Sequence, residues 1–248
     1  GLGMLQSVWD GVAPTLGLQF MVAFLPTFLI NIFKAFFTCR AENIQQHKLQ
    51  IWYYWFQIVF VVLATAVGQN FREFAMTLIT EPTAIITVLA NTMPYATHYY
   101  MNFLVLQAMS HAMNLTRYIP WFKYRAAVAI FDEKQAKVLA EPEDQDYYGM
   151  GSRSARWTIM LGIGLVYGTL SPPINILCFI NFFICRLAYG FLFMFAETHK
   201  PDTGGYFFVT ACLQTFPLLI IYVILMAAVF YQRAASVGPC IIAALSLL

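Results

Sequence analysis

The sequence predicts an all-α membrane protein, a polytopic bundle of six to seven transmembrane helices. Three observations carry this prediction. Of the 248 residues, 60% are hydrophobic and only 10% are charged, so the usual soluble pattern of one apolar and one charged face cannot be kept along the whole chain. Six apolar runs are long enough to cross the hydrocarbon layer, which takes about 20 helical residues. The charged residues lie mostly between these runs.

The runs are continuously apolar, whereas strands of a membrane barrel alternate at every second residue. The Ser171-Pro172-Pro173 turn should join two of the helices as an antiparallel pair, because proline cannot continue one helix and favours the first turn of the next. The spacing of Gly164 and Gly168 should allow a neighbouring helix to approach closely. The expected spans are residues 12–37, 52–67, 82–113, 157–170, 173–196 and 205–231, with a partial last helix at 237–248.

The positions of Lys and Arg predict the orientation. If the helices alternate and the chain starts outside, only Arg72 and Arg233 of the 14 basic residues fall on the outer side. This is the positive-inside distribution of membrane proteins. We therefore expect residues 115–156 to form a cytosolic loop in a multi-pass protein of the plasma membrane or an endomembrane. The net charge of +2 gives no reason to expect a nucleic-acid partner.

Other functional classes find no support in the sequence. It contains no Ser/His/Asp arrangement, paired carboxylates or phosphate-binding loop, so we do not expect an enzyme. The five cysteines and four histidines show no zinc spacing, so we expect no metal and no cofactor. Gly1 is not an initiator residue, and we expect the chain to be part of a longer polypeptide.

The span at residues 82–113 carries the most informative pattern. Polar residues recur there at steps of three and four, which places them in one stripe of an otherwise apolar helix. Leu106 and Met109 continue the stripe as an apolar constriction, the kind of gate that closes by dewetting. Polar groups in hydrocarbon need water or a partner helix, so a water-filled path and an interhelical hydrogen-bonded seam are the two alternatives. The candidate pore-lining residues are Thr87, Asn91, Tyr95, His98 and Asn102.

Three further residues bear on this reading. Pro94 removes a backbone donor in mid-helix and should act as a hinge. His98 is either a neutral hydrogen-bonded residue or a pH-sensitive one, because its ordinary pKa is about 6.5. Arg186 is an intramembrane charge that either extends to the inner interface or faces a polar cavity.

Several short motifs follow one another in the second half of the chain. They are VYGTLSPPI at Val166–Ile174, INFF at Ile180–Phe183, RLAY at Arg186–Tyr189, and Glu197-Thr198 before Thr203–Gly205. Further motifs occur upstream, at Phe24–Thr27, Trp55–Phe60, Met93-Pro94 and Tyr99-Tyr100. In their order and spacing these segments resemble the seven-helix region of the OSCA/TMEM63/CSC1 family of hyperosmolality-gated and mechanosensitive channels.

The resemblance implies an anoctamin-like fold, a pore within each subunit, and opening of a calcium-permeable cation pathway by membrane tension or osmotic stress. It also implies upstream helices and a cytosolic domain, which we do not expect within these 248 residues, and a homodimer or other membrane subunits as partners beside lipids and cations. The family's glycine hinge is replaced here by Ala108, which has roughly 1 kcal/mol better helix propensity and should stiffen the helix. The alternatives are a lipid scramblase and a non-conducting structural subunit of a larger complex.

Overall fold

The computed structural model describes residues 24–37, 42–59, 96–140, 149–197, 202–234 and 236–246. Within these residues every regular element is a helix, which agrees with the all-α class expected from the sequence. The helices are Phe24–Phe36, α2 (Glu42–Gln57), α6 (Thr97–Asn114), α7 (Tyr118–Val128), α8 (Glu133–Ala140), α9 (Met150–Tyr167), α10 (Pro172–Phe195), α11 (Tyr206–Arg233) and α12 (Gly238–Leu245).

The predicted spans agree with the helices best in the second half of the chain. The helices α10 and α11 match the expected spans within two residues at each end. Both are long and apolar enough to cross a membrane, and Phe24–Phe36 is a shorter apolar helix. In contrast, α9 begins at Met150, seven residues before its expected start. Much of the remaining apolar sequence lies outside the described residues, so the number of six to seven spans stays a prediction.

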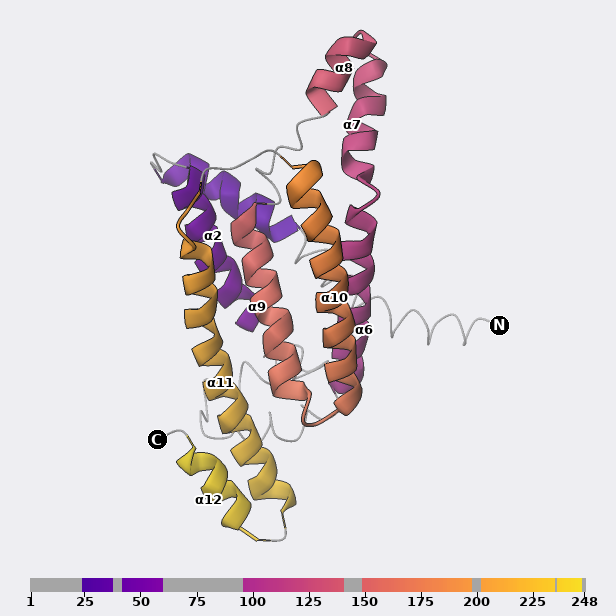
Figure 1. Ribbon diagram of the computed structural model, residues 1–248. Helices are drawn as coiled ribbons and strands as arrows, with labels where there is room; N and C mark the ends of the chain where they lie inside the picture. Colours follow the sequence, from indigo (N-terminus) through magenta and orange to yellow (C-terminus); the bar gives the residue numbers. More distant parts are fainter. Residues whose placement is uncertain are drawn as a thin grey trace, which may run out of the picture.

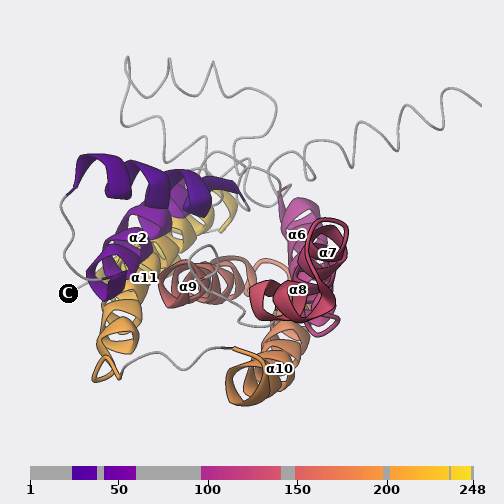
Figure 2. The ribbon, with the colours of Figure 1, turned by 90° about the horizontal axis from the view of Figure 1, so that it is seen from above.

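Helix α9 lies at the centre of the bundle, between α2 and α11 on one side and α6 and α10 on the other (Figure 2). Its small residues make this position possible. A Cβ atom at Gly151 would lie 2.0 Å from the main-chain oxygen of Gln46 on α2, and one at Gly162 would lie 2.7 Å from the Leu218 side chain on α11. The α2 backbone and the Leu218 side chain of α11 therefore approach α9 to distances that a larger residue would not allow.

The turn between α9 and α10 confirms the predicted antiparallel pair (Figure 1). Pro172 occupies the first turn of α10, where its missing N–H costs nothing. The side-chain amide of Asn175 donates to the main-chain oxygen of Gly168 at 3.2 Å and closes the turn. Gly164 also faces α10, with its Cβ position 3.0 Å from the sulfur of Cys178. The predicted role of Gly164 and Gly168 in close packing is confirmed.

Cross-helix contacts fix the direction of each helix. Gln50 of α2 donates to Ser154 of α9 at 2.8 Å and to the main-chain oxygen of Phe207 of α11 at 3.0 Å, so α2 lies beside both helices. The three helices run in the same direction (Figure 1). The helices α6 and α10 run the opposite way (Figure 1). Beyond the end of α6, α7 and α8 protrude from the bundle, and we call this side the α7 end.

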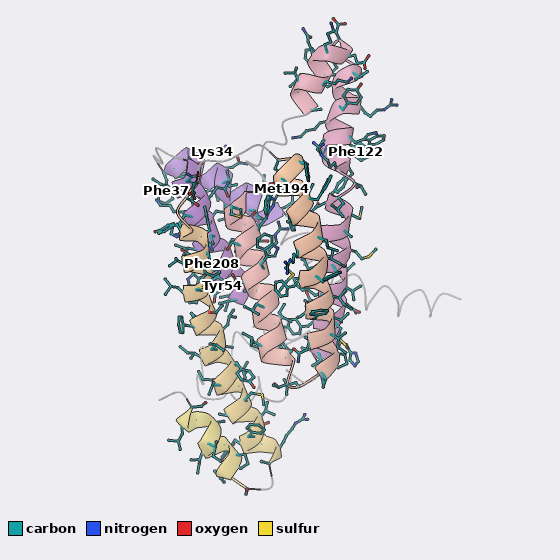
Figure 3. All side chains as sticks on the ribbon, in the orientation of Figure 1. Lys34, Phe37, Tyr54, Phe122, Met194 and Phe208 are labelled. Carbon is teal, nitrogen blue, oxygen red and sulfur yellow. The ribbon has the colours of Figure 1, made fainter. Side chains whose placement is uncertain are left out.

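The largest buried side chains are aromatic, and many side chains on the outer surface are apolar. Tyr53, Tyr54, Tyr100, Tyr167, Phe33 and Phe103 are the largest fully buried side chains. On the outside, Met194 of α10 and Phe208 of α11 are 72% and 73% exposed (Figure 3). Outward-facing residues of this size suit contact with lipid and not with water.

Candidate functional site

The predicted pore-lining residues fall partly on the described chain. Thr87, Asn91, Pro94 and Tyr95 lie outside the described residues. His98 and Asn102 lie on the exposed face of α6, and Met109 follows on the same face, 60% exposed. Leu106 is half-buried beside them, and the helix continues unbroken through Ala108. The part of the stripe that is described therefore points away from α9 and α10.

The opposite face of α6 carries a second polar row, which the sequence reasoning missed. Thr97, Tyr100, Gln107 and His111 are all buried there. Their steps of three, seven and four place them on one side of the helix, so the signal was present in the sequence. The row forms one wall of a polar seam between α6, α9 and α10, and the helix thus presents polar groups to both sides.

The seam begins far from the α7 end with two tyrosines. The Tyr167 hydroxyl donates to the Tyr100 hydroxyl at 3.0 Å, and the two ring centroids are 4.0 Å apart. Further along, the amide of buried Asn181 on α10 donates to the main-chain oxygen of Leu104 at 3.3 Å and contacts the sulfur of Met160 at 3.2 Å. Polar groups buried in this way tie α6, α9 and α10 together, because an unpaired amide in an apolar interior would be costly.

Near the α7 end, Tyr189 of α10 joins two residues of α6. Its hydroxyl lies 3.0 Å from Nδ1 of His111 and accepts from the side-chain amide of Asn114, also at 3.0 Å. Trp157 of α9 packs on the same ring at a centroid distance of 5.3 Å. The Tyr189 side chain therefore joins three helices, α6 through its hydroxyl and α9 through its ring.

A buried ion pair lies beside this tyrosine. Arg153 Nη1 is 2.7 Å from one carboxylate oxygen of Glu197 and donates to the other at 3.0 Å. The two side chains are only 7% and 2% exposed, and the guanidinium lies over the rings of Tyr189 and Phe193. Such charges are tolerated in an interior only as a paired, hydrogen-bonded group. The pair connects the first turn of α9 to the residue just past α10.

Arg186, predicted from the sequence to be an intramembrane charge, lies elsewhere, exposed on α10. It lines a hollow of about 350 Å³ between α9 and α10. The other residues of the lining are Trp157, Phe182, Cys185, Tyr189, Gly190 and Phe193. The walls of this hollow are mainly aromatic and not polar, and the choice between the two expectations for Arg186 stays a prediction.

At the start of α2, His47 contacts α11. One ring nitrogen lies 3.0 Å from the Thr210 hydroxyl, and the ring packs on Tyr206 at a centroid distance of 4.2 Å. Burial lowers the pKa of this imidazole below its usual range, because the charged form loses hydration. Within the described residues, no three His, Cys, Asp or Glu side chains form a group that could hold a metal ion.

Comparison with known proteins places this architecture in a family. A family model described as "Calcium-dependent channel, 7TM region, putative phosphate" matches residues 3–230, almost the whole chain. The match supports a multi-pass membrane protein of channel type.

Curated relatives agree with this match. RSN1 of Saccharomyces cerevisiae is 25% identical over 215 residues, covering 86% of this chain and 22% of that protein. Sporulation-specific protein 75 of the same yeast is 22% identical over 177 residues, covering 68% and 20%. The CSC1-like protein ERD4 of Brassica juncea is 22% identical over 189 residues, covering 73% and 25%. The chain thus spans a quarter or less of the length of these relatives.

The resemblance that rested on VYGTLSPPI and the motifs around it is confirmed by these matches. The chain belongs to the family of calcium-dependent channels with a seven-helix membrane region, the OSCA/CSC1 family.

Proposed function

We propose that the chain forms the membrane region of a mechanically or osmotically gated, calcium-permeable cation channel. Ions would pass along the face of α6 that carries His98 and Asn102. The observation that supports this path is the exposure of both polar side chains on a helix of an otherwise apolar outer surface. Polar groups in contact with hydrocarbon cost free energy, so water should face them. Membership in a family of calcium-dependent channels supports the same proposal.

The gate lies next along the same face, towards the α7 end. Val105, Leu106, Met109 and Met113 form a mainly apolar stretch, in which Ser110 is an exposed polar residue. An apolar constriction of this kind empties of water in the closed state and blocks ions. Membrane tension would favour an open state of larger in-plane area, because that state interacts differently with a stretched bilayer. The hydrogen-bonded seam on the other face of α6 would serve as the fixed wall.

We further propose that the α7 end faces the cytosol. Successive helices α2, α6, α9, α10 and α11 alternate in direction, as expected for consecutive spans (Figure 1). Basic residues gather at the α7 end, with Lys123, Arg125, Lys134 and Lys137 in α7 and α8. Arg233 lies in the last turn of α11 at the other end. This distribution follows the positive-inside bias.

The proposed gate can be tested by measuring the current across liposome membranes that contain the full chain, with and without applied tension. Leu106→Asn should hydrate the constriction and give a leak current without tension. Leu213→Asn, an equivalent change at an exposed position of α11, is the matched control and should stay closed. A Leu106→Asn variant with an unchanged closed-state current would overturn this gate.

A second candidate function is lipid scrambling, favoured by the same exposed stripe. A polar row that is open to the outside, with apolar residues on either side, suits the passage of lipid headgroups while the acyl chains stay in the bilayer. The two functions differ in what crosses. If lipids with fluorescent headgroups move to the other leaflet of vesicles without tension, scrambling is supported. If ions cross while the lipids stay in their leaflet, the channel function is supported. Neither ions nor lipids would cross through a purely structural subunit.

A further inference from the structure

The hollow between α9 and α10 has no role in the proposed path. It lies on the outer side of α10, and Arg186 is the one charged residue among those that line it. The residues of α10 that are exposed around it are apolar. Phe183, Leu187 and Phe191 are 55%, 58% and 51% exposed.

Arg186 lies deep along its helix. Phe195 at the end of α10 lies nine positions further along, which corresponds to about 14 Å at the helical rise of 1.5 Å per residue. A flexible side chain can cover only part of that distance to the interface. Among the described residues no carboxylate pairs with Arg186, and the buried carboxylate of Glu197 is bound to Arg153. A guanidinium in apolar surroundings needs an anionic partner.

The hollow offers a second donor beside the guanidinium. The indole nitrogen of Trp157, which lines the same hollow, is buried, and the group beside it is the Cys185 sulfur, a weak acceptor. Buried donors without a strong acceptor are rare in proteins. A positive charge, a weakly bonded N–H and aromatic walls together suit an amphiphile with an anionic head.

We propose that this hollow binds one membrane phospholipid, whose phosphate group pairs with Arg186 and accepts from the Trp157 indole. Guanidinium and phosphate form strong, charge-assisted hydrogen bonds. The acyl chains lie against Phe182 and Phe193 and along the apolar outer face of α10. A lipid is the fitting source of the phosphate because the hollow opens on this apolar face, which a free anion would have to reach through hydrocarbon. The residues that line the hollow come from α9 and α10, and Tyr189 among them also bonds to His111 and Asn114 of α6.

Native mass spectrometry of the full chain in detergent tests the proposal, with phosphatidylglycerol added at a fixed ratio. The wild type should keep one lipid per chain, and Arg186→Gln should bind it about tenfold more weakly. Arg233→Gln, which removes an exposed arginine from the other end of the bundle, is the matched control and should bind as the wild type does. Gly190→Leu should also weaken binding, because a Cβ at Gly190 meets nothing within 4 Å and the new side chain can fill the hollow.

Two results would overturn the proposal. One is equal lipid retention by the wild type, Arg186→Gln and Gly190→Leu. The other is displacement of the bound lipid by millimolar inorganic phosphate, which would assign the site to a free anion. If Arg186→Gln does not fold, Gly190→Leu decides alone, since it leaves both donors in place and favours the helical state.

Discussion

Arg153 at the start of α9 and Glu197 just after α10 form a buried ion pair, with 2.7 Å between Nη1 and the nearer carboxylate oxygen. The pair holds the α7 end of this antiparallel helix pair closed. Its two partners are 44 residues apart in the sequence. Each end of the α9 and α10 pair is joined by a hydrogen bond, from the Asn175 amide to the Gly168 backbone oxygen at the turn and from Arg153 to Glu197 at the open end.

Glu197→Ala should lower the free energy of unfolding by about 3–5 kcal/mol, because it leaves the Arg153 charge buried without a partner. Unfolding in mixed micelles, followed by tryptophan fluorescence, measures the change. Glu133→Ala on α8 is the control, since Glu133 pairs with Lys137 at an exposed site and should contribute below about 1 kcal/mol. Equal effects of the two substitutions would contradict the structural role of the buried pair.

Tyr189→Phe should separate α6 from α10 at the α7 end. Loss of the hydroxyl leaves the His111 Nδ1 and the Asn114 amide without their shared partner, at a cost of about 1–3 kcal/mol in the free energy of unfolding. Tyr206→Phe at the exposed start of α11 is a suitable comparison, because Tyr206 is 55% exposed. A loss no larger than that of Tyr206→Phe would show that the hydroxyl does not join these helices.

Gly151→Ala should weaken the contact between α2 and α9. A Cβ there would lie 2.0 Å from a backbone oxygen, so the helices must move apart, and overpacking of this type costs about 1–3 kcal/mol. Gly190→Ala is the matched control, since its Cβ would meet nothing within 4 Å and should stabilise α10 by roughly 1 kcal/mol. The thermal unfolding midpoint should therefore fall for Gly151→Ala and rise for Gly190→Ala, relative to the wild type.

The His47 contact should make stability depend on pH. Because burial lowers the pKa of His47 in the folded state, the unfolded chain binds more protons below the ordinary pKa near 6.5. Stability is therefore full above that pH and falls as the pH decreases through it. His47→Gln keeps a polar group but cannot titrate, so its unfolding midpoint should change less between pH 7 and about pH 5. An identical pH dependence in both proteins would contradict this.

The sequence predicted the helices with continuous apolar character well, and those with buried charges less well. The start of α9 was placed seven residues late because Arg153 and Arg156 interrupt the apolar run. In the fold, Arg153 is neutralised by Glu197, and its charge no longer opposes burial. The pair itself was predictable in principle, since an antiparallel hairpin brings the start of α9 to the end of α10.

The candidate site was harder to predict, because α6 has two polar rows. The row with His98 and Asn102 and the row with Tyr100, Gln107 and His111 both show helical spacing, and spacing alone does not tell which row meets a neighbouring helix. That choice depends on partners such as Tyr167 and Tyr189, which come from α9 and α10. The turn residues Ser171, Pro172 and Pro173, in contrast, determine a local geometry and were interpreted correctly.

The outward side chains of α10 and α11 also determine how the protein must be handled. Aromatic and aliphatic residues such as Phe179, Phe195 and Phe216, each more than half exposed, extend along both helices. Once the bilayer is removed, these surfaces will adhere to those of other copies unless a surfactant covers them. The choice of amphiphile thus affects every measurement on this molecule. Assays in nanodiscs keep these apolar surfaces of α10 and α11 in contact with lipid.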